Sequence, residues 1–112
     1  MKTVFHLSTD DTDKTSELLG NIKNLWADQT VEIETTAVVL NAQAVEIATE
    51  DSGASDYLSK MIEGGLQVKV CSNSVEGQGI DENNLLDGVE VVSSGVGEVN
   101  RLQEEGYNYI RI

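Results

Sequence analysis

The segment Leu66-Gln-Val-Lys-Val-Cys71-Ser-Asn-Ser74 joins a predicted strand directly to a predicted helix start. Apolar and polar residues alternate from Leu66 to Cys71, which is typical of a β-strand. Ser72, Asn73 and Ser74 then supply the short polar side chains that cap helices. Because a strand that passes at once into a helix is the repeating unit of α/β proteins, this segment indicates that fold class and puts Cys71 at a strand end.

Strand and helix alternate in the same way along the rest of the chain. We expect strands where β-branched and apolar residues gather, and helices where apolar residues recur every three or four positions. The expected strands are 3–7, 31–40, 66–71, 89–92 and 107–110, and helices are expected along the apolar stripe from Leu18 to Trp26, over 42–50 and 57–62, and between Ser94 and Gly106. This order predicts an α/β fold, a three-layer α/β/α sandwich with a mostly parallel five-stranded sheet, formed as one domain by residues 1–112.

Acidic residues outnumber basic ones along the whole chain. Twenty Asp and Glu stand against seven Lys and Arg, so the formal net charge is −13. This charge repels a phosphate backbone and excludes nucleic acid as a partner. An evenly acidic surface is typical of a halophilic protein from a salt-rich cytoplasm, where the Debye length falls to about 3 Å at 1 M salt and the repulsion is screened.

The apolar runs and the cysteine content indicate the compartment. Runs such as Ala37 to Leu40 are far shorter than the roughly 20 residues of a membrane span, and no signal peptide precedes Thr3. Cys71 is the only cysteine, so it cannot form an internal disulfide, as is usual in a reducing compartment. We therefore expect a cytoplasmic protein with no membrane partner.

Cys71 is the first candidate for chemistry because of its position. Open α/β sheets bind ligands at the carboxyl ends of their strands. Backbone N–H groups and the helix dipole at the start of the following helix favour the thiolate, which is the nucleophilic form of the side chain. The alternative is that Cys71 is a small buried apolar residue that only packs against its neighbours.

His6 is the only histidine and ends the first expected strand. In a parallel sheet it lies at the same edge as Cys71, where an imidazole can act as a base or tune a thiol. Its apolar neighbours Phe5 and Leu7 favour the alternative of a hydrogen-bonded structural histidine.

No pattern indicates a metal or a cofactor. One histidine and one cysteine provide no zinc site. The acidic run from Asp10 to Asp13 lacks the glycine and the closing glutamate of a calcium loop, and helix capping explains it better. Gly95-Val-Gly97 lacks the third glycine of a dinucleotide-binding fingerprint, since residue 100 is Asn. We expect neither a metal nor a cofactor.

Several local strings resemble the DsrE/DsrF-like family of small sulfur-relay proteins over nearly the whole chain. The matching strings are Val4-Phe-His6 with Asp10-Asp11, Cys71-Ser-Asn-Ser74, and Ser94-Gly-Val-Gly-Glu98 followed by Glu105-Gly-Tyr107 and Tyr109-Ile110. The chain departs from the family at Asn41-Ala-Gln43, where relatives often have Gly-Pro, and at Ser72-Asn73-Ser74, where they often have Asn-Asn-Thr.

The resemblance implies an α/β/α fold, assembly as a trimer or hexamer, and a persulfide on a cysteine that Cys71 matches. The resulting hypothesis is a persulfide carrier that accepts sulfane sulfur on Cys71 and passes it from a donor protein to an acceptor protein. The N–H groups around Asn73 and Ser74 would stabilise its negative charge, with Ser72 as a further binding residue, and His6 would be at most an auxiliary. The alternative is a non-catalytic homo-oligomeric assembly or a small-ligand-binding module in which Cys71 is a packing residue.

Overall fold

The computed structural model describes residues 1–112 and contains one five-stranded sheet in the order β4-β3-β2-β1-β5. Every neighbouring pair of strands is parallel. The strands are β1 (Lys2–Leu7), β2 (Thr35–Leu40), β3 (Gln67–Cys71), β4 (Glu90–Val92) and β5 (Tyr107–Arg111). The helices are α1 (Thr12–Ala27), the 3₁₀ helix η1 (Ala42–Ala48), α2 (Ser55–Glu63), α3 (Ser72–Gly77), the 3₁₀ helix η2 (Glu82–Asn84) and α4 (Gly95–Glu104). The predicted α/β fold is confirmed, and the sheet is parallel throughout.

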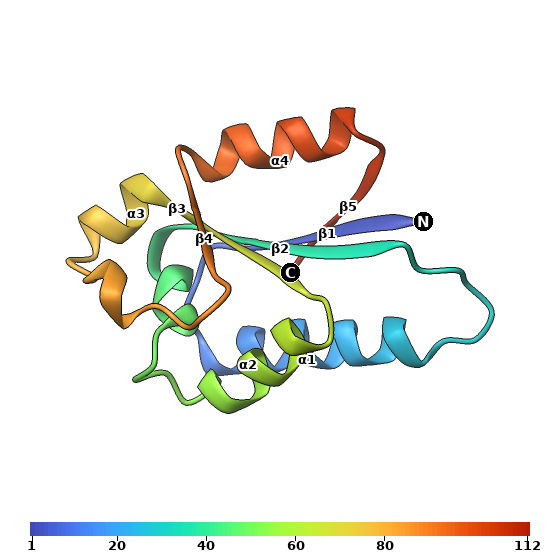
Figure 1. Ribbon diagram of the computed structural model, residues 1–112, viewed down its shortest axis with the longest axis horizontal. Coiled ribbons are helices and arrows are strands. Elements are labelled where there is room, and N and C mark those ends of the chain that lie inside the picture. The colour runs from blue at the N-terminus through green and yellow to red at the C-terminus, as the bar shows by residue number, and fades with distance from the viewer.

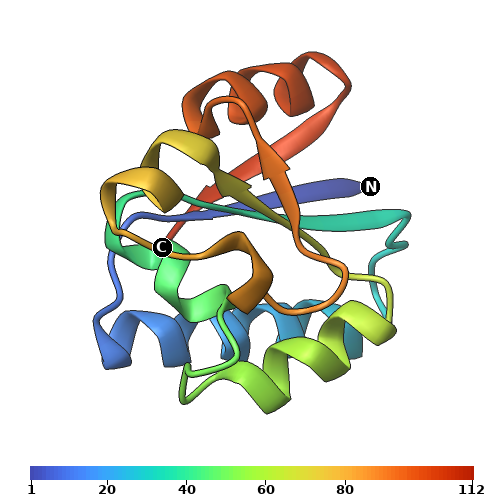
Figure 2. The same ribbon diagram turned by 60° about the vertical axis from the view of Figure 1, so that its left-hand side comes forward.

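The chain direction explains which helices cover which face. Strands β1 to β4 follow one another outward, so right-handed crossovers put α1 and α2 on one face of the sheet. The connection from β4 to β5 returns across the whole sheet in the opposite direction, so the same handedness puts α4 on the other face. Figures 1 and 2 show α4 on one side of the sheet, with α1 and α2 on the opposite side.

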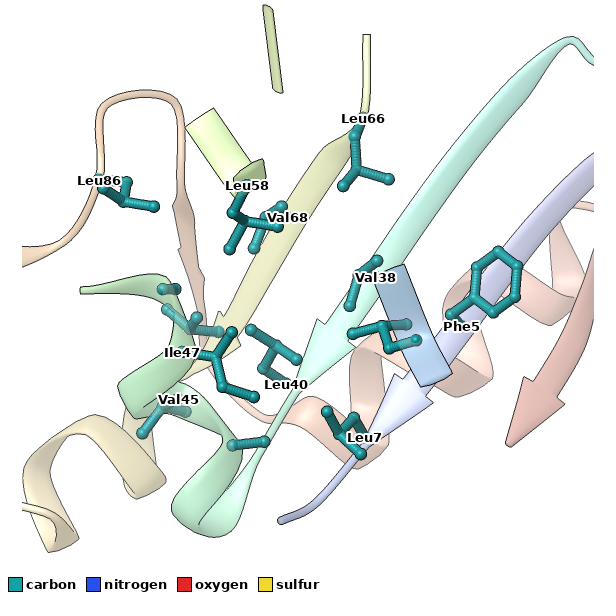
Figure 3. Packing of buried hydrophobic residues seen from close by; sticks show 14 of the residues in the cluster. Phe5, Leu7, Val38, Leu40, Val45, Ile47, Leu58, Leu66, Val68 and Leu86 are labelled. Carbon is teal, nitrogen blue, oxygen red and sulfur yellow. The ribbon is translucent and has the colours of Figure 1, made fainter. Parts of the chain in front are cut away.

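The two faces of the sheet differ in the size of their apolar cores. Seventeen buried residues form one cluster between the sheet and the α1, η1 and α2 layer, and Figure 3 shows its strand and helix side chains packed together. Only five buried residues form the second cluster, between the sheet and α4: Val4, Ala37, Val39, Val99 and Leu102. Most apolar burial therefore lies on the α1 and α2 face. No helix is long and apolar enough to cross a membrane.

Two helix starts follow the sequence pattern. The Asp11 side chain caps α1 by accepting from the N–H groups of Asp13 and Lys14. Ser94 caps α4 by accepting from the N–H of Gly97. These bonds satisfy N–H groups that have no partner within the helix.

The second strand is shorter than its sequence pattern predicts. We expected residues 31–40, but β2 begins at Thr35. Thr35 pairs with Lys2, the first residue of β1, so the preceding residues have no neighbouring strand. Of these residues, Glu34 donates its N–H to the Met1 carbonyl, and the Glu32 carbonyl accepts from the N-terminal amine of Met1. The apolar alternation at Val31 and Ile33 therefore lies in the segment that precedes β2, outside the sheet.

Candidate functional site

Cys71 lies at a point where the chain diverges to the two faces of the sheet. It ends β3 and is the N-cap residue of α3, and it pairs with Val92 at the end of β4. From β3 the chain enters α3, whose Val75 belongs to the larger core, whereas from β4 it enters α4 on the opposite face. Open α/β sheets bind ligands where neighbouring connections separate in this way.

The thiol of Cys71 is nearly buried but surrounded by polar hydrogens. Its residue is 7% exposed. Burial raises the pKa of the thiol, but hydrogen bonding to the Ser74 hydroxyl and to the N–H groups of Gly95, Ser74 and Asn73 lowers it by more. The net pKa lies below the ordinary value of 9.0. The Cys71 side chain makes no capping hydrogen bond to α3 in the structure. The surrounding donors therefore stabilise chiefly the thiolate, which is the charged form of the side chain.

The three residues after Cys71 do not cap α3, in contrast to the prediction. We expected Ser72, Asn73 and Ser74 to cap the helix, but α3 already begins at Ser72 and its N-cap is Cys71. The capping prediction is therefore wrong. Asn73 and Ser74 supply N–H groups from the first turn that lower the pKa of the thiol, as expected for N–H groups at this helix start.

Ser74 also ties α3 to the start of η1, which follows β2. Its Oγ accepts a hydrogen bond of 2.8 Å from the N–H of Ala42. Ala42 has a φ of 52°, a left-handed conformation that costs a residue with a side chain about 1 kcal/mol or more. With its oxygen lone pair used by Ala42, the Ser74 hydroxyl is left free to donate its hydrogen to the sulfur.

Gly95 allows α4 to start in contact with the site. A Cβ atom at this position would lie 3.2 Å from the Cβ of Asn41 and 3.3 Å from the Cβ of Cys71. Both distances are shorter than ordinary carbon contacts. A glycine is therefore needed at residue 95 for the N–H at the start of α4 to approach the thiol. This close approach, and not nucleotide binding, explains the first glycine of Gly95-Val-Gly97.

His6 lies on the same edge and the same face of the sheet as Cys71, but it does not contact the thiol. Its Nδ1 faces the Tyr109 hydroxyl at 2.7 Å and the Arg111 guanidinium at 3.1 Å, and its Nε2 faces Oδ1 of Asn41 at 3.1 Å. Because the guanidinium can only donate, Nδ1 is the acceptor, and the imidazole proton sits on Nε2. A hydrogen bond therefore links His6 to Asn41, whose Cβ lies beside Gly95.

The charge state of His6 follows from the same partners. Burial lowers the pKa of the imidazole, the hydrogen bond to Asn41 raises it, and the positive charge of Arg111 lowers it again. The net shift is downward from 6.5, so His6 is uncharged at neutral pH.

A buried ion pair holds α4 against β3 below the thiol. Nζ of Lys69 lies 3.1 Å from Oε2 of Glu98, whose side chain is 2% exposed. Lys69 also pairs with Glu90, and Glu98 with Arg101. Oε2 has no hydrogen-bond partner of good geometry, so the charge of Lys69 compensates it. Since Lys69 precedes Cys71 by two positions, the pair lies on the same face of β3 as the thiol.

Sequence reasoning missed Asn41, Gly95 and the Lys69 to Glu98 pair. One signal was present for the pair, because Lys69 lies between Val68 and Val70 in a strand, and a lysine there needs a partner when it is buried. The structure contains no group of three side chains that could hold a metal ion. A cavity of about 970 Å³ lies elsewhere, between α1, η1 and α2, and neither Cys71 nor His6 lines it.

Fold and site together define a small three-layer α/β protein with one thiol at the carboxyl edge of a parallel sheet. The chain belongs to the DsrE/DsrF-like family, whose model matches residues 1–112. This confirms the resemblance found in the sequence and suggests a role of the sulfur-relay type.

The solved structures that are similar to this one include two proteins of unknown function. A protein of unknown function from Methanobacterium thermoautotrophicum has a TM-score of 0.93 at 38% identity, with 99% of this chain and 98% of that chain covered. A conserved protein of unknown function from Bacteroides thetaiotaomicron shares the fold, with a TM-score of 0.72 at 19% identity and coverage of 99% and 94%. No protein with a curated functional description matches the chain.

Proposed function

We propose that this protein is a persulfide carrier in a sulfur relay, with Cys71 as the residue that accepts and releases sulfur. The observation that carries the proposal is the ring of donors around the thiol, which come from the starts of both α3 and α4 and lower the pKa of Cys71. A structural cysteine needs no such donors, whereas a nucleophilic one gains thiolate from them.

The transfer is two successive thiol exchanges. The Cys71 thiolate attacks the outer sulfur of a donor persulfide, the donor's S–S bond breaks, and the donor leaves as a thiolate with the bonding electron pair. The outer sulfur is then bound to Sγ as a persulfide anion. An acceptor thiolate attacks this outer sulfur, and Cys71 leaves as the thiolate. No oxidant or second cysteine is needed.

The neighbouring residues have separate roles in this scheme. The N–H groups of Asn73, Ser74 and Gly95 stabilise the leaving Cys71 thiolate in the second step. Ser72 begins the helix turn that positions them. His6 is an auxiliary that orients Asn41 beside Gly95.

The partners follow from the same scheme. A carrier needs a donor of sulfane sulfur and an acceptor protein with a free thiol, and the acidic surface excludes nucleic acid. We place it in the reducing cytoplasm, where a lone thiol stays reduced. We also propose a homo-oligomer, a trimer or hexamer, because Tyr57, Val96 and Ile110 are apolar side chains left exposed. Sedimentation at micromolar concentration should give a mass several times 12.1 kDa.

Sulfur loading followed by intact-mass measurement tests the function. The folded protein should gain the mass of one sulfur atom from a persulfide donor and lose it to dithiothreitol. Cys71→Ser should gain none while keeping the same thermal unfolding midpoint within a few degrees. Wild-type protein that takes up no sulfur from any of several donors would overturn the proposal.

The alternative is a binding or assembly module in which Cys71 only packs, and the 7% exposure of Cys71 favours it. Alkylation separates the two functions. A packing cysteine reacts with iodoacetamide only after the protein unfolds, whereas a carrier cysteine reacts in the native protein, at a rate that rises with pH through its lowered pKa.

A further inference from the structure

Arg111, on the edge strand β5, has no acidic partner although the chain has a net charge of −13. Its NH1 nitrogen donates to Oγ of Ser8 at 2.9 Å and to Nδ1 of His6 at 3.1 Å. No carboxylate lies within ion-pair distance of the guanidinium; Lys14, Lys69 and Arg101 each have such a partner, whereas Lys2, Lys23 and Lys60 do not. The guanidinium is thus held in place by neutral acceptors.

The side chains clustered with Arg111 add no negative charge. His6 is neutral, with its acceptor nitrogen turned toward Arg111 and the Tyr109 hydroxyl. Ser8 donates its own hydrogen to Asn41 at 2.6 Å. The cluster of His6, Ser8, Asn41, Tyr109 and Arg111 therefore carries one uncompensated positive charge. NH1 makes the only side-chain bonds of Arg111, so the N–H groups on NH2 and Nε remain free for a ligand.

This charge faces the same region as the Cys71 thiol. Arg111 pairs with His6 in the sheet register, and His6 with Val39, so their side chains lie on the α4 face. Asn41 is hydrogen-bonded to His6 and lies against Gly95, as Cys71 does. The guanidinium reaches over β1 to Ser8, which leaves about two strand spacings, roughly 10 Å, between it and β3.

We propose that the Arg111 cluster binds the oxyanion of a small sulfur donor, so that the sulfur loaded onto Cys71 comes from a low-molecular-weight anion. This inference rests on the proposed function. The donor class has a sulfane sulfur at one end and a sulfonate or carboxylate at the other, as in thiosulfate and in persulfides of amino-acid thiols. A guanidinium with free N–H groups matches both oxyanions with paired hydrogen bonds.

The loading step breaks the S–S bond of the donor, whichever of the two donors is used. With thiosulfate, the Cys71 thiolate attacks the sulfane sulfur, the S–S bond breaks, and sulfite leaves with the electron pair. With a carboxylate persulfide, the same attack releases the parent thiolate. In each case Arg111 holds the oxyanion and takes no part in the bond changes, so it is a binding residue of the site.

A comparison of matched donors tests the inference. The donors are thiosulfate, the persulfide of N-acetylcysteine, and the persulfide of N-acetylcysteine amide, which lacks only the carboxylate. Loading rates are measured by intact mass at constant ionic strength. Arg111→Gln should slow loading from the two anionic donors about tenfold and leave the amide donor unchanged, because one charged contact is lost. Lys60→Gln removes the same charge from exposed α2 on the opposite face and should change none of the rates.

Each outcome distinguishes this inference from the proposed function. If thiosulfate and the carboxylate persulfide both depend on Arg111, the site accepts any small oxyanion donor; dependence of one alone identifies the source. Equal slowing of the amide donor by Arg111→Gln would show a structural role and overturn the inference. So would unchanged rates with all three donors, although Cys71 would still be a carrier. Sulfate, added as a competitor, should slow only the anionic donors, and only when Arg111 is present.

Discussion

The N–H of Gly95 faces the thiol of Cys71, although the two residues belong to different strand and helix units. Cys71 ends β3 and Gly95 begins α4, which follows β4. A single Cβ atom at residue 95 would come within 3.3 Å of the Cβ of Cys71. The electrostatic environment of the thiol therefore depends on how α4 is seated on the sheet.

Gly95→Ala tests this dependence directly. The added methyl group should push the start of α4 away, raise the pKa of Cys71 and lower the free energy of unfolding by about 1–2 kcal/mol. Gly97→Ala is the matched control, because its Cβ meets only Ser94 at 3.6 Å, an ordinary contact. It should leave the thiol pKa unchanged and stabilise the helix by about 0.5 kcal/mol. The thiol pKa is measured by thiolate absorbance near 240 nm against pH, and equal pKa values in the two variants would contradict the role given to Gly95.

The lowered pKa of Cys71 also predicts how stability changes with pH. The folded state releases the thiol proton at a lower pH than the unfolded state, whose value is near 9.0. The free energy of unfolding should therefore gain a contribution as pH rises from the folded pKa toward 9.0, and lose it as pH falls again. Urea denaturation of wild type and Cys71→Ser across this range isolates the contribution. A difference between the two proteins that does not vary with pH would count against the thiolate.

The lowered pKa of His6 predicts a loss of stability in acid. Because the pKa of His6 lies below 6.5 in the folded state, the unfolded chain binds a proton first as pH falls through 6.5. Wild type should then lose stability relative to His6→Gln between pH 7.5 and the folded pKa. Arg111→Gln should raise the pKa of His6, since the guanidinium charge lowers it. NMR titration of the imidazole checks both statements, and a pKa at or above 6.5 in the wild type would refute the assigned neutral state.

The pair of Lys69 and Glu98 predicts a recoverable loss of stability. Lys69→Met leaves the buried Glu98 carboxylate without its lysine and should cost about 3 kcal/mol. Replacing both residues, as Lys69→Met with Glu98→Leu, should restore most of this loss because no buried charge remains. Lys14→Met removes an exposed pair in α1 and should cost less than about 0.5 kcal/mol. Denaturant melts measure all three, and additive losses in the double variant would contradict a coupled pair.

The net charge predicts a strong dependence on salt. With a formal charge of −13, the compact state is destabilised by self-repulsion that salt screens. The thermal midpoint should rise by several degrees between 0.05 and 1 M NaCl, corresponding to about 1 kcal/mol or more. The thermal midpoint is followed by circular dichroism. A midpoint that stays constant over this range would refute the halophilic interpretation of the composition.

Local patterns predicted most of the fold because each strand and helix carries its own periodicity. The segment from Leu66 to Cys71 and the stripe of α1 are examples, since burial on one face imposes the spacing in each. The extent of β2 could not be predicted, because it depends on where its partner β1 begins. The length of β2 is set by the pairing of the two strands, and the sequence of either strand alone does not encode it.

The site was predicted only in part for a related reason. A parallel sheet brings His6 and Cys71 to one edge, and strand alternation is enough to infer this. The bond from Ala42 to Ser74 and the approach of Gly95 to Asn41 depend on how separate units pack, which no local pattern encodes. The sequence therefore indicated the candidate thiol and the N–H groups of Asn73 and Ser74, but not the approach of Gly95.

The unequal apolar cores have a consequence for hydrogen exchange. Helix α4 is held by five buried apolar residues and an ion pair, whereas the opposite layer shares seventeen. Regions with few apolar contacts open at the lowest free energy, so amides of α4 should exchange through partial opening while those of β1 and β2 exchange only on global unfolding. Opening α4 uncovers Cys71 without unfolding the rest of the chain, and access to the thiol is then an equilibrium property of one helix.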